Sequence, residues 1–224
     1  AQGGTLHSGY RVQRIARGLA GSTGWRVDDA PFDAVVLATT STEAARLVLT
    51  AHTAHPTLQG PEAAALQAWA RKAQALRFTA IATVYAQTSA LPQGTVLSQP
   101  MLALRPGAGQ PAQFVFDRMQ LGGPAGLLAF VVSASEGDRA TLEREVLQQA
   151  QDQLGLQGLR IVQTVVEKRA TFACTPALQR PPQTVANGLC ACGDYVEGPY
   201  PATLEGAVLS GTAAAGTPVA ATMA

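Results

Sequence analysis

The sequence predicts a mixed α/β (α+β) fold in which one domain is inserted into another. The central region, 53–182, alternates strand-like and helical stretches, as expected of a mixed sheet with helices. The flanking pieces, 1–52 and 183–224, are expected to belong together as parts of a second domain. In the first piece the apolar run FDAVVLATT, Phe32–Thr40, precedes a helical stretch, and such runs are typical of parallel strands covered by helices.

The first piece is expected to run strand, turn, strand, turn, buried strand, helix. Residues 10–16 alternate in polarity, and a strand resumes at 25–27 after a turn that contains Gly, Ser and Thr. The helix expected at 42–50 carries Glu43 in its first turn, where an acidic side chain interacts favourably with the unpaired N–H groups.

The central region is expected to contain two helices and several strands. Pro61 suits the first position of a helix, because the missing N–H would have no partner there. A second helix is expected to begin near Asp138 and to end at Gly155. Stretches rich in strand-forming residues occur at 77–87, 113–117, 126–135 and 159–176.

The composition argues against several classes of protein. The 224 residues are 47% hydrophobic and 14% charged, with a net charge of +1. Nucleic-acid binders usually show a basic surplus, so no nucleic acid is expected as a partner. No apolar run of about 18 residues is present, so no transmembrane helix is expected. The three cysteines lack metal-ligand spacing and are expected to be reduced, which favours a cytoplasmic location.

Common catalytic and metal-binding patterns are absent from the sequence. His52 and His55 are three residues apart, but no carboxylate or cysteine adjoins them, so no metal site is expected. The sequence contains no G-x-S-x-G, no Walker A motif and no G-x-G-x-x-G, and 107–109 is expected to be a loop. No catalytic residue can be assigned on this basis.

One stretch near the end of the chain, GDYVEGPYPATLEGAVLSG at 193–211, does have an unusual pattern. A short strand at 188–193 is expected to end at Asp194, and ligands of α/β sheets bind at such strand ends. A helix is expected to begin at Pro201 or the residue after it and to run to about Ala214. Each glycine inside that helix costs about 1 kcal/mol relative to alanine, so a close neighbour is expected. The residues alone leave two neighbours open: tightly packed protein, or a flat ligand at the start of the helix.

The pattern G-D-x(n)-P-A-T-x-E-G-A-x-x-S-G closely resembles the C-terminal FAD signature of the amine oxidase and phytoene desaturase superfamily. AQGGTLHSGYRVQRI and FDAVVLATTSTEAARLV are similar to the segment in which such chains return to the FAD domain. FVFDR, LLAFVVSAS and VVEKRATFACTP resemble the squalene-associated FAD-dependent desaturases, the hydroxysqualene dehydroxylase group. The resemblance covers about residues 1–215. It implies a mixed-sheet substrate domain flanked by C-terminal parts of a Rossmann-like FAD-binding domain.

The resemblance also implies roles for individual residues. Asp194 would hydrogen-bond the ribityl-diphosphate part of FAD, and Gly193 would leave room for it. Backbone N–H groups near the expected helix start would face the flavin N1/C2 edge, and Glu205 would help to hold the turn. Val12 would contact the adenine through its backbone. The residues expected to bind the cofactor are therefore Val12, Gly193, Asp194, Ala202, Thr203, Leu204 and Glu205.

The chain differs from the family pattern in one large respect. Members of this family begin with a strand and a G-x-G-x-x-G loop that binds the FAD diphosphate, and the sequence has neither. The chain resembles the C-terminal half of such an enzyme, so we expect it to hold FAD weakly or not at all by itself, and to be inactive alone.

The expected function is that of a C-terminal part of an FAD-dependent oxidoreductase that acts on an apolar, isoprenoid or squalene-type substrate. A flavin amine oxidase and a non-catalytic binding or assembly module are the alternatives. The expected partners are a small apolar substrate, the missing N-terminal FAD-binding half or a second copy of the chain, and a peripheral membrane contact.

Overall fold

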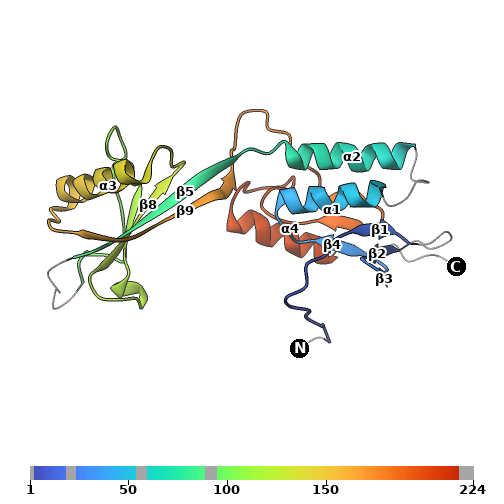
Figure 1. The fold of residues 1–224 in the computed structure, drawn as a ribbon, viewed down its shortest axis with the longest axis horizontal. Helices are drawn as coiled ribbons and strands as arrows, with labels where there is room; N and C mark the ends of the chain where they lie inside the picture. The colour runs from blue at the N-terminus through green and yellow to red at the C-terminus, as the bar shows by residue number, and fades with distance from the viewer. Residues whose placement is uncertain (1–2, 19–23, 54–59, 89–94, 217–224) are drawn as a thin grey trace. The chain divides into compact units, whose positions relative to one another are not determined.

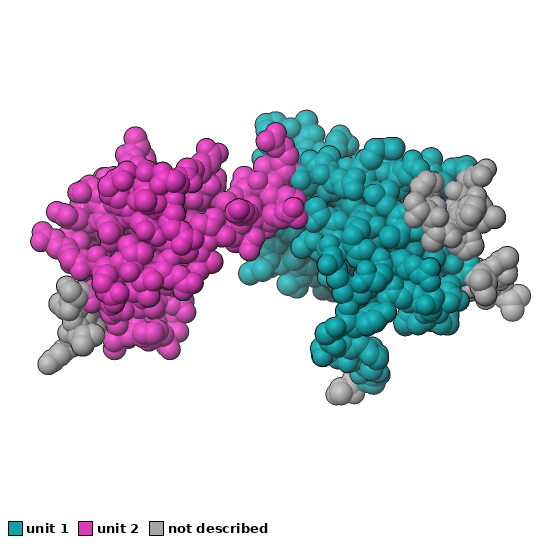
Figure 2. All heavy atoms as spheres, in the orientation of Figure 1, with its two compact units in different colours: residues 1–76, 174–224 teal, residues 77–173 magenta. Residues whose placement is uncertain are grey.

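The computed structural model describes residues 3–18, 24–53, 60–88 and 95–216. Its strands and helices form two compact units, residues 1–76 with 174–224, and residues 77–173 (Figure 2). The α+β class expected from the sequence is confirmed, since four α-helices accompany a parallel strand pair and antiparallel sheets. In the part of the chain that the structure describes, no helix is both long and apolar enough to cross a bilayer.

The first unit is built around a small sheet whose strands come from both ends of the chain (Figure 1). Strand β4 (Val35–Leu37) pairs in parallel with β11 (Leu189–Ala191), with Val36 opposite Cys190. Strand β10 (Thr184–Ala186) pairs antiparallel with the other side of β11. A separate antiparallel meander consists of β1 (Ile15–Arg17), β2 (Trp25–Val27) and β3 (Ala30–Phe32).

Three helices complete the first unit, α1 (Ser41–Thr53), α2 (Pro61–Gln74) and α4 (Leu204–Gly216). Helix α2 packs against α1 and β10. The indole N–H of Trp69 in α2 donates to the Pro182 carbonyl at 2.7 Å. These contacts place α2 in the first unit, although its residues lie within the central region 53–182 expected from the sequence.

A buried cluster around Trp25 connects three parts of the first unit. The Arg17 guanidinium lies 4.4 Å from the centre of the Trp25 ring and forms an ion pair with Glu62 of α2. Arg17 and the Trp25 indole both donate to the Asn187 carbonyl at 2.9 Å. The contacts of Arg17 and Trp25 therefore connect the meander to α2 and to the β10–β11 turn.

The apolar run at 32–40 forms a strand in parallel pairing, but it differs from the expected strand in length and burial. Phe32 ends β3, the parallel strand comprises only 35–37, and Val36 is 47% exposed. Among the described residues β4 has a strand partner on one side only, so it is an edge strand rather than a strand buried on both faces.

The second unit is a five-stranded antiparallel sheet with a helix, α3 (Arg139–Leu154), on one face. Asp138 caps α3 by accepting from the Thr141 N–H at 2.9 Å, and Gly155 ends it in the left-handed conformation, as expected. A short 3₁₀ turn, η1 (Met119–Leu121), follows β7. In spatial order the strands are β6 (Met101–Ala103), β7 (Phe114–Asp117), β8 (Leu127–Ser133), β5 (Phe78–Gln87) and β9 (Arg160–Phe172).

Buried polar side chains hold the loops of the second unit. The side-chain amide of Gln149 in α3 accepts from the Ala112 N–H at 2.8 Å and donates to the Ala112 carbonyl at 2.9 Å. The buried Asp117 carboxylate accepts from the Val96 N–H at 2.8 Å and the Leu97 N–H at 3.1 Å. Burial alone would raise the pKa of Asp117, but these bonds and those from Gln120 and Met119 outweigh it and lower the pKa.

Replacing Asp117 with Asn should destabilise the second unit by about 1–3 kcal/mol at neutral pH, because an amide cannot accept from all four donors. A lowered folded-state pKa means that this stabilisation is present above the unfolded-state pKa of about 4 and is lost as the pH falls. Urea unfolding at several pH values measures both effects. The exposed Glu136→Gln is the matched control. An Asp117→Asn variant that loses stability on acidification as steeply as the wild type would contradict the assignment.

Candidate functional site

The carboxyl ends of β4 and β11 meet at one edge of the sheet, because the two strands are parallel and in direct register. Thr39–Ser41 follows β4 and leads into α1, and Gly193–Asp194 follows β11. Ligands of α/β folds bind at this edge. The buried hydroxyls of Ser41 and of Tyr195, the residue directly after Asp194, hydrogen-bond to no described residue. The hydrogen bonding of this edge is therefore incomplete within the described chain.

Gly193 and Asp194 form the turn that follows β11. Gly193 has φ +152°, and a Cβ there would lie 2.7 Å from the Tyr195 ring, so the glycine is required by local packing. Burial raises the pKa of Asp194, and the charge of Arg180 opposes this shift only in part. A half-buried carboxylate that lacks a strong protein partner is typical of a functional position.

The turn that precedes α4 has strained backbone. Tyr200 and Ala202 both have positive φ, 51° and 58°. The Thr203 hydroxyl donates to the Tyr200 carbonyl at 2.6 Å and accepts from the Gly206 N–H at 3.1 Å, which makes Thr203 the N-cap of the helix. Strain of this kind persists only where the surrounding structure over-determines it.

Helix α4 begins at Leu204, so the expectation of a helix start at Pro201 or Ala202 was wrong. The left-handed Ala202 cannot continue a helix, and its N–H donates to the Asp194 carbonyl at 3.3 Å. The N–H groups of Thr203, Leu204 and Glu205 donate to no acceptor among the described residues. The Glu205 side chain is exposed and forms no hydrogen bond there, so Thr203 holds the turn.

The close neighbour that the sequence predicts for the glycines of α4 is, at Gly206, the protein itself. A Cβ on Gly206 would overlap the Tyr200 carbonyl oxygen, which leaves no space for a ligand at that position. The Ser210 hydroxyl donates to the Gly193 carbonyl at 3.0 Å and accepts from the Gly193 N–H at 2.9 Å. These contacts fasten α4 to the end of β11 and so place its first turn beside Asp194.

The first turn of α4 nevertheless presents features that fit a flavin. The Leu204 side chain is 88% exposed and that of Val208 is 65% exposed, on one side of the helix. They lie next to the free N–H groups at the helix start, which carry partial positive charge. A flat ring with an apolar face and an electron-rich polar edge matches this combination, and the residues present therefore fit the ring of FAD.

Arg180 is a further residue of the site that the sequence did not reveal. Its guanidinium donates to the Val196 carbonyl at 2.7 Å and to the Gly198 carbonyl, so it holds the loop between Asp194 and α4. A single arginine in a proline-rich segment carries no sequence signal for such a role.

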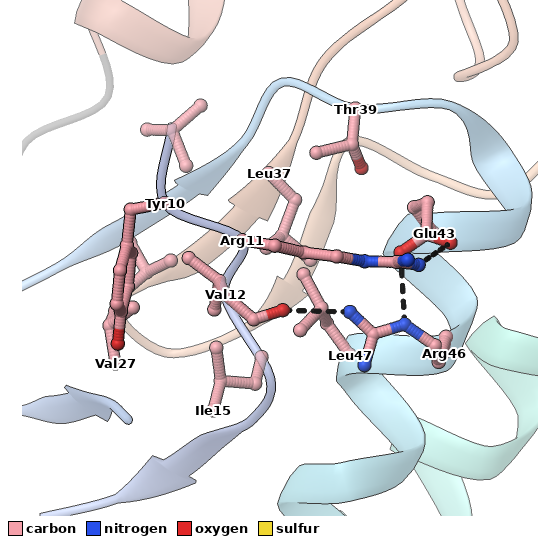
Figure 3. A pocket seen from close by; sticks show the side chains of 12 residues that line it. Tyr10, Arg11, Val12, Ile15, Val27, Leu37, Thr39, Glu43, Arg46 and Leu47 are labelled. Atoms are coloured by element: carbon pink, nitrogen blue, oxygen red, sulfur yellow. Dashed lines mark hydrogen bonds and ion pairs between the residues drawn. The ribbon is translucent and has the colours of Figure 1, made fainter. Parts of the chain in front are cut away.

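Val12 lines a separate hollow of about 640 Å³ in the first unit (Figure 3). The Arg46 side chain of α1 donates to the Val12 carbonyl at 2.9 Å, while the Val12 N–H has no acceptor among the described residues. The lining is mainly apolar and comprises Tyr10, Arg11, Val12, Ile15, Val27, Val35, Val36, Leu37, Thr39, Glu43, Arg46 and Leu47.

A parallel strand pair whose carboxyl edge carries a carboxylate, and a helix start with free N–H groups, are features that this chain shares with dinucleotide-binding α/β proteins. The chain belongs to the flavin containing amine oxidoreductase family, whose model matches residues 1–217. FAD as the cofactor is confirmed by this match. No curated protein matches the chain.

Solved structures show the same fold at low sequence identity. A structure assigned as a protoporphyrinogen oxidase from Exiguobacterium sp. 255-15 is 16% identical, with a TM-score of 0.54 over 91% of this chain. An oxidoreductase from Methanosarcina mazei is also 16% identical, with a TM-score of 0.57 over 92% of this chain. The match covers 45% and 48% of those two chains, so this chain spans about half their length.

Two interior glycines of α4, Gly206 and Gly211, allow a matched test of the packing. Gly206→Ala should lower the free energy of unfolding by about 1–3 kcal/mol, because the added methyl overlaps the Tyr200 carbonyl. Gly211→Ala should raise it by up to about 1 kcal/mol, because nothing lies near that position and alanine favours the helix. Chemical denaturation of both variants measures the difference. Equal effects of the same sign would contradict the close contact.

Asp194→Asn should stabilise the chain at neutral pH and weaken FAD binding in the flavin-loaded protein. A raised folded-state pKa means that the stabilisation of the wild type is present below the unfolded-state pKa, about 4, and is lost as the pH rises through the folded-state pKa. The gain of the variant should therefore vanish in acid. Thermal melts at two pH values and flavin titration measure the two effects, and a variant less stable than the wild type at neutral pH would contradict them.

Proposed function

We propose that this chain supplies the substrate-facing domain and the C-terminal part of the FAD site of an oxidoreductase that acts on an apolar, isoprenoid or squalene-type substrate. The observation that carries the substrate class is a pair of uncharged side-chain rows on the open face of the five-stranded sheet. Helix α3 and the main core of the second unit cover the opposite face.

Strand register arranges the open face in rows. In each row, side chains from all five strands point to the same side of the sheet, because directly paired residues share a face. Phe114 is 39% exposed, Met101 48% and Val165 45%. Two neighbouring rows contain no charged residue. The first row consists of Ala103, Phe114, Val131, Thr83 and Val165. The second row consists of Met101, Phe116, Ala129, Tyr85 and Gln163.

This wall favours a substrate with a long hydrocarbon surface. Its few polar groups, the hydroxyls of Thr83 and Tyr85 and the amide of Gln163, lie among apolar side chains. Binding sites for apolar ligands commonly combine such a surface with a small number of polar groups that orient the ligand.

The remaining residues would bind and tune the cofactor. Bound FAD would supply the oxidising power by accepting a hydride from the substrate. The free N–H groups of Thr203, Leu204 and Glu205 would stabilise negative charge placed beside them, as preorganised dipoles do. Asp194 would accept hydrogen bonds from hydroxyl groups of the ribityl chain.

The diphosphate site would come from outside the described residues. Strand β4 has an open edge, at which the backbone of Val36 has no strand partner among the described residues. An unpaired parallel edge is a template for a further strand. We infer that a strand of the N-terminal FAD-binding half pairs here, with self-association of the chain as the competing outcome.

An amine substrate is the second candidate function. Phe114, Phe116 and Tyr85 place aromatic rings on the same open face, and rings of this kind attract ammonium groups by cation–π interaction. No carboxylate lies in the two rows to pair with the ammonium, which favours the apolar substrate. A non-catalytic binding module would lack flavin altogether.

The test is co-expression of the chain with an N-terminal half that carries a G-x-G-x-x-G loop, followed by a visible spectrum of the purified complex. We expect stoichiometric flavin in the complex and little or none in the chain alone. Anaerobic mixing with squalene-type isoprenoids should then bleach the flavin band.

Each outcome decides between the candidates. Bleaching by alkyl amines but not by isoprenoids would establish the amine oxidase alternative. A complex that forms without flavin would contradict the oxidoreductase and support a binding module. Stoichiometric flavin in the chain alone would show that its site is complete without another half.

A further inference from the structure

The segment that contains Val12 precedes β1 and belongs to no strand, so side chains must fix its position. On one side the Asp28 carboxylate holds it. That carboxylate accepts from the Tyr10 hydroxyl at 2.5 Å, the Gln13 N–H at 3.0 Å and the Arg14 N–H at 2.9 Å. The Arg14 carbonyl accepts from the Asp28 N–H, whereas the Val12 and Gln13 carbonyls have no backbone donor among the described residues.

Arg46 of α1 holds the segment from the other side. Its guanidinium donates to the Val12 carbonyl and to the Glu43 carboxylate, both at 2.9 Å (Figure 3). It also donates to the Gln13 carbonyl at 2.8 Å. Among the described residues, no other side chain donates to these two carbonyls. Since the guanidinium is a planar fork, it satisfies three acceptors in one geometry, which an ammonium group does not do.

Glu43 keeps the fork in place. It lies one turn before Arg46 on α1, and it also accepts from Arg11 at 3.0 Å. Hydrogen bonding from Arg46 and the neighbouring positive charges lower the pKa of Glu43, so the carboxylate is ionised at neutral pH. Arg46 thus meets an anion on its own helix and two carbonyls on the facing segment.

Arg46 binds one backbone group of Val12 and leaves another free, and this affects which ligands the hollow can bind. The fork occupies the Val12 carbonyl, whereas the Val12 N–H keeps no acceptor among the described residues. A flat heterocycle with an acceptor nitrogen could use that donor and place its faces against the apolar lining, which includes Leu37 and Leu47. The hydrogen bonds of Arg46 therefore determine which backbone group of Val12 is available to a ligand in the hollow.

We propose that Arg46 is the positioning residue for the adenine end of FAD, because its guanidinium fixes the backbone of Val12 and Gln13. This inference rests on the proposed FAD site and adds a residue to it. Arg46 lines the hollow, but its guanidinium is engaged by Glu43, Gln13 and Val12, so it acts on the cofactor through Val12.

The test compares Arg46→Met, Arg46→Lys and the control Arg26→Met, which removes an ion pair to Asp29 but no contact to Val12 or Gln13, at a residue that does not line the hollow. In the 224-residue chain, both Arg46 variants should speed hydrogen exchange at the Gln13 and Arg14 amides. In the co-expressed complex they should raise the Kd for FAD about tenfold, the result of losing about 1.4 kcal/mol, and leave the Kd for riboflavin unchanged. The control should behave as the wild type in both measurements.

Riboflavin lacks the adenosine end and therefore separates a local role from a general one. Equal weakening of FAD and riboflavin would overturn the positioning role, since it would indicate damage to the fold. Unchanged hydrogen exchange at the Gln13 and Arg14 amides in the Arg46 variants would show that Arg46 does not hold this segment, and would overturn the proposal. A wild-type complex that binds no FAD would overturn the proposed function, and this inference with it.

Discussion

The parallel pairing of β4 with β11 is the interaction on which the rest of the first unit depends. The two strands are separated in the sequence by the whole of the second unit. That insertion begins and ends on directly paired strands, with Phe78 opposite Phe172, so its ends are adjacent and the two strands can meet. Their pairing brings the loop that leads into α1 and the turn at Asp194 to one edge. The candidate site exists because of this return of the chain.

Irregular segments around the site are held by side chains that bind backbone carbonyls. Arg46 holds the carbonyls at Val12 and Gln13, and Arg180 holds the loop before α4. In the second unit the amide of Gln149 performs the same task for the loop at Ala112. Buried or half-buried carbonyls outside sheets and helices need such partners, because an unpaired polar group costs free energy. These side chains allow non-repetitive backbone to keep a defined shape near the sheet edge.

The site also separates residues that stabilise the chain from residues that cost it stability. Gly206 and Ser210 fasten the start of α4 to the strand end, and both are explained by packing. Asp194 and Leu204 are different, because one is a carboxylate with a pKa raised by burial and the other an apolar side chain left in solvent. Groups that are unfavourable in the chain alone and lie together at a strand end are those a ligand would compensate.

Local sequence patterns determined most elements and the identity of the family. Asp138 and Gly155 bound α3 as expected because capping depends on neighbouring residues only. The start of α4 could not be predicted in this way, since Ala202 takes a left-handed conformation in which its N–H donates to the carbonyl of Asp194, a residue of another turn. Only the tertiary structure decided that β4 is an edge strand and that Arg46 and Arg180 bind backbone carbonyls. These features depend on contacts between segments far apart in the sequence, and no local periodicity or motif records such contacts.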